Sequence, residues 1–167
     1  MNLVTLIRAT ENDAELIHRM KYEAFLPIYE EYHDDEISPT REKIDKVIWQ
    51  LTNPGSEYYL IQVGGENAGA VRVARKWEMV DGEKIIRPDK NYISPIFILP
   101  RFQNGGVGQA VMNQLFEMYP NTKTWALDTI KQDARNCHFY ERCGFMRVGE
   151  EKRVNERMSL VDYEKEL

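Results

Sequence analysis

The amino-acid sequence predicts an α/β fold, and three observations lead to this prediction. Residues 92–99 are typical of a buried strand, which runs through a glycine-rich turn at 105–108 into a helix. Elsewhere, helical and strand periodicities alternate along the chain without internal repeats or low-complexity linkers. The chain has 167 residues, 43% hydrophobic and 29% charged, which is ordinary usage for one small globular domain.

The first third of the chain predicts one strand and two helices. Residues 3–8 form the strand, and Thr10 with Asp13 has the pattern of a capping box. The apolar stripe of the helix that follows consists of Ala14, Ile17, Met20, Ala24 and Ile28. Pro39 suits the first position of a second helix, because its fixed φ is helical and it lacks an N–H. Asn53-Pro54-Gly55 ends that helix, whose apolar residues are Ile44, Val47, Ile48 and Leu51.

The rest of the chain predicts mainly strands. Residues 58–63 and 68–74 indicate a hairpin around Gly64-Gly65, and Asp81-Gly82 marks a second tight turn. The helix after the glycine turn has an apolar face made of Val107, Val111, Leu115 and Met118. A short helix runs from Asp133 to a C-terminal cap at Gly144. The other predicted strands are residues 93–99, 124–128, 145–150 and 155–161.

The glycine turn has the features of an anion site. Gly105, Gly106 and Gly108 lack a Cβ, so the backbone can adopt positive φ and bring several N–H groups to a ligand phosphate. The helix that begins near Gly106 adds unpaired amides and the positive end of its dipole. A plain strand-to-helix connection is the alternative. The turn lacks the Gly-Lys-Ser/Thr of a P-loop, and too little chain follows Asp128 for a dinucleotide-binding sheet.

A second group of polar residues lies on the short helix. Asp133, Asn136 and Tyr140 are spaced by three and four residues, which puts them along one helical face. A partly polar packing face would have the same spacing, so the pattern leaves both interpretations open.

Together the two segments resemble the GNAT superfamily of acyl-CoA-dependent N-acetyltransferases. The family motif Gln/Arg-x-x-Gly-x-Gly/Ala matches Gln103-Asn-Gly-Gly106-Val-Gly108, and Ile98-Leu99-Pro100 matches the Val/Ile-x-Pro before it. A second motif, Tyr, three residues and Gly-Phe, matches Tyr140 to Phe145. The resemblance is specific over residues 92–147 and architectural elsewhere. It implies one N-acetyltransferase domain over 1–167, with a mixed, mostly antiparallel central sheet flanked by about four helices.

The resemblance also implies a donor, an acceptor and a set of binding residues. Acetyl-CoA is the expected acetyl donor, and the acceptor is a primary amine of a small molecule or a peptide. The family often has Asn where this chain has Asp133, so the sequence leaves open whether Asp133 or Asn136 contacts CoA. The residues predicted to bind the cofactor are Ile96, Ile98, Gln103, Asn104, Gly105, Gly106, Val107, Gly108 and Asn136. Pro95 marks a loosened strand, where the pantetheine arm would pair with Ile96 and Ile98; a bulge or an edge strand is the alternative.

The expected chemistry is direct attack of the amine on the thioester, with both substrates bound at once. The departing thiolate has a pKa of roughly 8.5 by analogy with Cys, and a tyrosine with a reference pKa near 10 can protonate it. Tyr140 is the predicted acid. Asp128 lies at the C-terminal end of a predicted core strand and is the candidate base, acting through water, although a solvated strand-end carboxylate is an equal interpretation.

Charge and composition bear on partners and location. A net charge of −5 argues against a nucleic-acid surface. The sequence has no 18-residue apolar run, its N-terminal apolar stretch is too short for a signal peptide, and its two cysteines fit no metal or redox spacing. We therefore expect a cytoplasmic protein without a membrane partner or a metal. The oligomeric state is left open, a homodimer included.

The acidic segment Glu30–Glu36 precedes the second predicted helix, in a region that lines the acceptor side of the cleft in the resembled family. It would attract a cationic amine, and a solvated loop is the alternative. A non-catalytic acyl-CoA-binding or sensing module is the alternative function, because such a protein would keep the glycine turn without a base or an acceptor site.

Overall fold

The computed structural model describes residues 3–167, and its elements follow the predicted order. A seven-stranded sheet has the strand order β1-β2-β3-β4-β5-β7-β6 and is mostly antiparallel, with β4 and β5 parallel. The mixed α/β class predicted from the sequence is therefore confirmed. The strands and α-helices in chain order are β1 (Val4–Arg8), α1 (Ala14–Tyr32), α2 (Ile44–Thr52), β2 (Ser56–Val63), β3 (Glu66–Val80), β4 (Glu83–Ile98), α3 (Val107–Met118), β5 (Thr124–Ile130), α4 (Ala134–Arg142), β6 (Met146–Arg153) and β7 (Ser159–Glu166).

The chain divides into two compact units, each built from separate segments. The first unit comprises Met1–Arg72 with Pro95–Leu115, and the second comprises Val73–Ser94 with Phe116–Leu167. The long strands β3 and β4 each contribute to both units. The prediction of a single domain over residues 1–167 stays a prediction.

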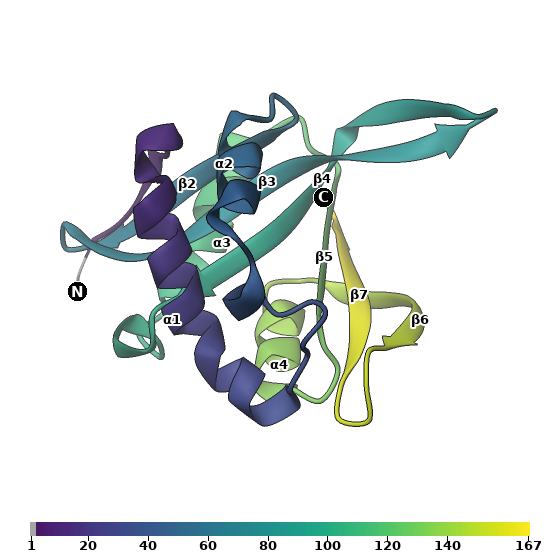
Figure 1. Ribbon diagram of the computed structural model, residues 1–167. Coiled ribbons are helices and arrows are strands. Elements are labelled where there is room, and N and C mark those ends of the chain that lie inside the picture. The colour runs from purple at the N-terminus through teal and green to yellow at the C-terminus, as the bar shows by residue number, and fades with distance from the viewer. Residues whose placement is uncertain (1–2) are drawn as a thin grey trace. The chain divides into compact units, whose positions relative to one another are not determined.

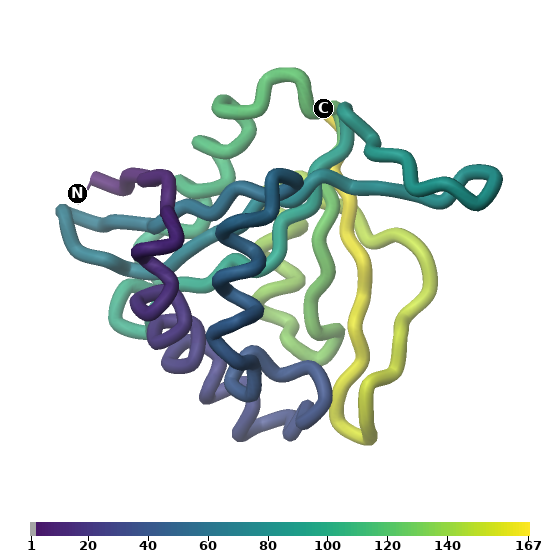
Figure 2. The backbone as a smooth tube through the Cα atoms, turned by 45° about the horizontal axis from the view of Figure 1, so that its top comes forward, coloured from purple at the N-terminus to yellow at the C-terminus, as the bar shows by residue number. Residues whose placement is uncertain are grey.

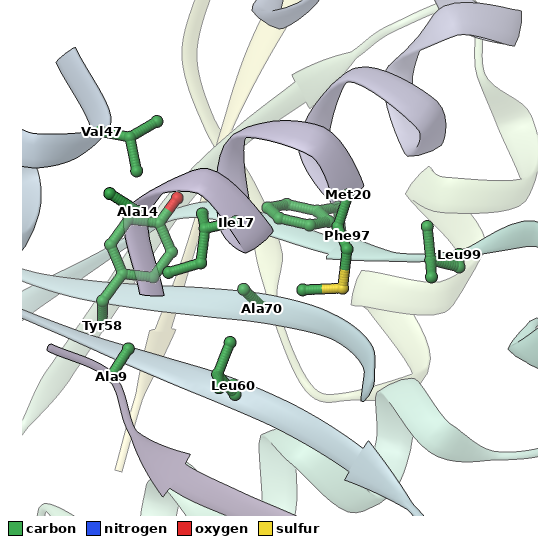
Figure 3. Close-up of a cluster of buried hydrophobic side chains, with 10 residues drawn as sticks. All are labelled: Ala9, Ala14, Ile17, Met20, Val47, Tyr58, Leu60, Ala70, Phe97 and Leu99. Atoms are coloured by element: carbon green, nitrogen blue, oxygen red, sulfur yellow. The ribbon is translucent and has the colours of Figure 1, made fainter. Parts of the chain in front are cut away.

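In the first unit, helices α1 and α2 lie over one face of β2 and β3, and α3 lies behind these strands (Figure 1). The predicted capping box is present at η1 (Glu11–Asp13), where Asp13 Oδ2 accepts the Thr10 N–H at 2.9 Å. A core cluster forms between the two helices and the strands, because the apolar stripes predicted from spacing face inward. Its buried members, drawn in Figure 3, are Ala9, Ala14, Ile17, Met20, Val47, Tyr58, Leu60, Ala70, Phe97 and Leu99.

The backbones of β3 and β4 approach closely at Gly69. A Cβ on this residue would lie 2.0 Å from the Phe97 carbonyl oxygen. On the next residue pair, the Leu99 N–H donates to the Ala68 carbonyl at 2.7 Å. Only glycine fits here, because a side chain would meet backbone rather than a flexible group.

Replacing Gly69 with alanine is therefore expected to destabilise the protein by about 3 kcal/mol, the upper end of the usual cost of overpacking. The urea midpoint at constant m-value measures this loss. Gly105→Ala is the matched control, because a Cβ there meets nothing within 4 Å, and its midpoint should stay near that of the wild type. Equal midpoints for the two variants would contradict the close approach.

In the second unit, β5, β7 and β6 run side by side, and the hairpin that joins β3 to β4 projects from them (Figure 2). The β5–β7 ladder is antiparallel and pairs all seven residues of β5, from Thr124↔Glu166 to Ile130↔Leu160. The parallel β4–β5 ladder is short and pairs only Lys90–Tyr92 with Thr124–Ala126. Strand β6 is irregular between Val148 and Lys152, where Gly149 has a φ of 70°.

Several predicted boundaries were wrong, although the elements themselves are present. The last two strands were predicted at 145–150 and 155–161 and lie at 146–153 and 159–166. Their residues are largely charged, so hydrophobic alternation gave a weak signal there. Strands β3 and β4 extend well beyond 68–74 and 93–99, because the predicted turn at Asp81-Gly82 closes a long hairpin. Pro39 begins a short 3-10 turn, and α2 starts at Ile44.

No helix among residues 3–167 is both long and apolar enough to cross a membrane.

Candidate active site

The glycine turn of the first unit has the backbone geometry that the sequence predicts. Gly106 has a φ of 79°, and Asn104 before it has a φ of 66°, so two residues of this turn are left-handed. The Gln103 side chain donates from Nε2 to the Ile98 carbonyl at 2.8 Å, which closes the turn against the end of β4. The Gln103 side-chain amide therefore holds the turn against β4. The groups of the turn that a ligand could reach are its backbone N–H groups.

The N-terminus of α3 leaves a run of amides unpaired. Helix α3 begins at Val107, and the Ala110 N–H already donates to the Gly106 carbonyl at 3.1 Å. Within residues 3–167, the N–H groups of Gly105, Gly106, Val107 and Gly108 donate to no protein acceptor. The first turn of α3 carries no acidic side chain that would compete for these donors. An anion placed here would meet several N–H groups and the positive end of the helix dipole.

Strand β4 directs alternate backbone groups to its two edges. The backbone N–H and C=O groups of Phe97 and Leu99 point toward β3. This is shown by the approach of Gly69 to the Phe97 carbonyl oxygen and by the hydrogen bond from the Leu99 N–H to the Ala68 carbonyl. Because strand backbone groups alternate, the N–H and C=O groups of Ile96 and Ile98 point to the opposite edge. The Ile98 carbonyl already accepts the Gln103 side chain, so an extended ligand at this edge would pair with the Ile96 backbone groups and the Ile98 N–H.

In the second unit, Asp133 and Asn136 have different roles at the start of α4. Asp133 is the N-cap, and its Oδ1 accepts the Asn136 N–H at 3.1 Å. The Asn136 side-chain amide makes no hydrogen bond among the described residues. The Asp133 carboxylate is thus used by the helix itself, whereas the Asn136 side chain is available to a ligand.

Tyr140 lies buried on α4 within an aromatic cluster. Its ring centroid is 5.2 Å from that of Phe139, 6.1 Å from that of Phe145 and 6.3 Å from that of Tyr163. Burial raises the pKa of Tyr140 above its ordinary value, with the nearby Cys143 and then Asp128 as smaller causes. Within residues 3–167, no protein group hydrogen-bonds to its hydroxyl. Tyr140 is therefore a protonated phenol with an available donor.

Asp128 is exposed on β5, and one of its oxygens is already held. The Tyr92 hydroxyl of β4 donates to Asp128 Oδ2 at 2.8 Å. Burial, followed by the negative charge of Asp128, raises the pKa of Tyr92 above its ordinary value. The Lys76 ammonium lies over the Tyr92 ring, with Nζ 4.4 Å from the centroid.

Tyr140 and Asp128 belong to opposite faces of β5. Leu127 is the ladder partner of Tyr163, whose ring packs against Tyr140, so α4 covers the face to which Leu127 belongs. Asp128 is the next residue, and its side chain points to the other face, with Tyr92. The two side chains therefore belong to opposite faces of the same strand.

The predicted site residues are distributed over both units. The glycine turn, Ile96 and Ile98 belong to the first, and Asp128, Asn136 and Tyr140 belong to the second. Tyr92 was not predicted from the sequence as a partner of Asp128. The two residues are 36 positions apart, so no spacing rule connects them. Only the ladder that pairs β4 with β5 brings them together.

The acidic segment Glu30–Glu36 is not uniformly solvated. Asp34 is only 4% exposed, its Oδ1 has no hydrogen-bond partner among residues 3–167, and burial raises the pKa of its carboxyl. The Asp35 carboxylate accepts the Tyr29 hydroxyl at 2.5 Å. Glu30, Glu31 and Glu36 are exposed. Asp34 is therefore a buried member of this segment, and the solvated charges are those of the exposed residues.

No group of three or more His, Cys, Asp and Glu side chains suited to a metal ion occurs among the described residues. Cys137 and Cys143 are free thiols.

The family model described as the acetyltransferase (GNAT) family matches residues 19–145. The chain therefore belongs to the GNAT family of acetyltransferases. Membership makes the protein an enzyme of the acyltransferase class, which disfavours the non-catalytic sensing module. Among curated proteins, no sequence matches the chain.

Solved structures share the fold at low sequence identity. An acetyltransferase from Thermus thermophilus is 17% identical, with 100% of both chains covered and a TM-score of 0.71. A spermidine N-acetyltransferase from Vibrio cholerae, in complex with CoA and spermine, is 19% identical, with 96% of this chain and 94% of that chain covered and a TM-score of 0.70. AAC(6')-Ib, in complex with ribostamycin and coenzyme A, is 20% identical, with 98% and 93% covered and a TM-score of 0.71.

Proposed function

We propose that the protein transfers the acetyl group of acetyl-CoA to a primary amine by direct attack, with both substrates bound together. The amine nitrogen forms a bond to the carbonyl carbon, and the C–S bond breaks. An ammonium acceptor first loses one proton through water to Asp128, which leaves the neutral amine that attacks. After the attack the nitrogen loses its second proton to solvent, Tyr140 gives its proton to the departing sulfur, and Asp128 releases its proton to solvent. Tyr140 regains its proton from solvent. A backbone N–H of β4 stabilises the oxyanion.

The single observation that carries this proposal is the state of Tyr140. A leaving thiolate needs a donor that is protonated at the working pH and is not bonded to another protein group. The buried phenol of Tyr140 meets both requirements, because its pKa is raised and its hydroxyl has no partner in the described part of the chain.

The donor site that we propose uses the unpaired backbone amides of the glycine turn. The phosphates of acetyl-CoA bind the N–H groups of residues 105–108, with Asn104 holding the turn in its left-handed conformation. The pantetheine arm pairs with the outward backbone groups of Ile96 and Ile98. Asn136 contributes its free side-chain amide, and Gln103 acts through the turn that it closes. The CoA present in two of the compared structures supports a CoA-derived donor.

The acceptor that we propose is a cationic primary amine. Spermine accompanies one compared structure and ribostamycin another, which supports an amine as the class of substrate. The exposed carboxylates of Glu30 and Glu31, in the last turn of α1, and of Glu36, in the loop after it, give this end of the helix a negative field. A small molecule and a peptide amine both fit this description.

Neutralising Glu30, Glu31 and Glu36 together with glutamine is expected to lower kcat/KM for the best amine several-fold, because electrostatic steering acts on the encounter rate. Added salt should weaken the wild type more than the variant. The matched control replaces the exposed Glu66, Glu83 and Glu117, which changes the net charge equally. Equal salt sensitivity in the wild type and the Glu30 variant would contradict steering by this segment.

A screen of amines with acetyl-CoA, read by the release of free thiol, tests the function itself. Turnover with a cationic primary amine is the expected result. Tight binding of acetyl-CoA without turnover on any amine would contradict the catalytic proposal. It would favour the alternative function, a non-catalytic acyl-CoA-sensing module.

The remaining expectations stay predictions: a cytoplasmic location, the absence of nucleic-acid and membrane partners, and an oligomeric state that includes a homodimer. Sedimentation of the purified protein tests the last of these.

A further inference from the structure

The Tyr92–Asp128 hydrogen bond leaves the candidate base with one fixed and one open oxygen. The Tyr92 hydroxyl donates to Oδ2 at 2.8 Å. Among residues 3–167, Oδ1 of Asp128 has no protein partner, and the residue is exposed. A base that acts through water needs an open oxygen whose direction is constant. The hydrogen bond supplies that constancy without using the second oxygen.

The charges around Asp128 do not hold it in place by themselves. Its ladder partner on β7 is Asp162, so two carboxylates lie directly opposite each other on the same face. Like charges in this arrangement repel. Lys152 Nζ lies 3.5 Å from Asp162 Oδ2, but its side chain is 72% exposed and neutralises that charge only weakly. Without another contact, the Asp128 carboxylate would rotate away from Asp162.

Tyr92 is itself held firmly enough to direct a neighbour. Its strand is tied to the segment before β5 by Asn91, whose Nδ2 donates to Thr122 Oγ1 at 2.7 Å in a buried position. The Lys76 ammonium packs over the Tyr92 ring. Burial and the negative charge of Asp128 raise the pKa of Tyr92, which favours the protonated phenol that donates this hydrogen bond.

We infer that Tyr92 is a positioning residue of the transfer reaction, which fixes the Asp128 carboxylate so that its open oxygen takes the proton of the acceptor amine. This inference rests on the proposed function, in which Asp128 is the base. Tyr92 touches neither substrate in this role and acts through Asp128. A displacement of about 1 Å at such a base can cost roughly 10²-fold in rate, which sets the scale of the effect.

Replacing Tyr92 with phenylalanine removes the hydroxyl and keeps the ring. The expected result is a kcat lower by about 10- to 100-fold, with KM for acetyl-CoA changed less than about twofold, because the loss concerns the proton transfer alone. The matched control is Tyr59→Phe. Tyr59 also donates its hydroxyl to a carboxylate, Glu57 Oε2 at 3.0 Å, but lies outside the site. Its kcat should equal that of the wild type.

A double-mutant cycle with Asp128→Asn separates positioning from a general structural effect. If Tyr92 acts through Asp128, then Tyr92→Phe should cost almost nothing further once Asp128→Asn has removed the base. An equal loss in both backgrounds would show that Tyr92 supports the fold and would overturn the inference.

The outcomes also distinguish this inference from the function on which it rests. Strong loss in Asp128→Asn with wild-type kcat in Tyr92→Phe would overturn the role of Tyr92 and leave the base in place. Wild-type kcat in Asp128→Asn would overturn both the base assignment and the role of Tyr92. Absence of turnover by the wild type on any amine would remove the proposed function before either variant is made.

Discussion

Replacing Tyr140 with phenylalanine is expected to lower turnover about 10²- to 10⁴-fold, the usual contribution of a general acid. The substitution keeps the ring, and with it the packing against Phe139, Phe145 and Tyr163. The hydroxyl has no protein partner within residues 3–167, so its removal leaves no buried group unsatisfied. Steady-state kinetics should therefore show a lower kcat with a nearly unchanged KM for acetyl-CoA.

The pH dependence gives an independent check on Tyr140. Burial raises its pKa, so the protonated form persists to higher pH than in an exposed tyrosine with a pKa near 10. An acid of this kind loses its proton only above that value. Up to about pH 10, the kcat of the wild type should therefore not fall through loss of the Tyr140 proton. Any fall of kcat in this range should also occur in Tyr140→Phe. Wild-type turnover in Tyr140→Phe would exclude the residue as the acid.

Replacing Gly106 with valine is expected to abolish the stabilisation of the protein by acetyl-CoA. A β-branched residue at a φ of 79° costs about 1–3 kcal/mol and pulls the turn toward negative φ. Because the phosphate site consists of the backbone amides of residues 105–108, this change redirects the donors themselves. A ligand at 100 times its Kd stabilises a protein by about 2.7 kcal/mol, and that gain should vanish in a thermal-shift measurement.

Gly65→Val is the matched control for this experiment. Gly65 also has a positive φ, 85°, and a Cβ there meets nothing within 4 Å, as at Gly106. Both variants should therefore melt at a lower temperature without ligand, with a far-UV spectrum close to native. Only Gly65→Val should keep the shift on addition of acetyl-CoA. Equal shifts in the two variants would remove the glycine turn as the phosphate site.

Local patterns in the sequence were sufficient for the elements that bury one apolar face. The stripe of α1 and the capping box at Thr10 predicted their structures correctly, because helical spacing and caps are short-range features. The glycine turn was predictable for the same reason, since positive φ and a helix N-terminus are encoded within a few residues. Strands β6 and β7 were misplaced by up to five residues, because their charged residues carry no clear alternation.

The sequence by itself determined the fold class, through the helical and strand periodicities that alternate along the chain. It also determined the turn at 105–108 and the polar face of α4, which depend on neighbours within one turn or helix. Tertiary structure decided the roles of individual side chains. The capping bond showed that the Asp133 carboxylate is used by α4, whereas the Asn136 side chain is not. Asp34 is buried and is not one of the solvated charges. The β4–β5 ladder brings the Tyr92 hydroxyl to the Asp128 carboxylate. The burial of Asp34 and the Tyr92–Asp128 bond depend on residues far apart in the chain, where no periodicity applies and only packing sets distance and burial. The capping bond spans three residues, but the spacing alone leaves open which of the two side chains it uses.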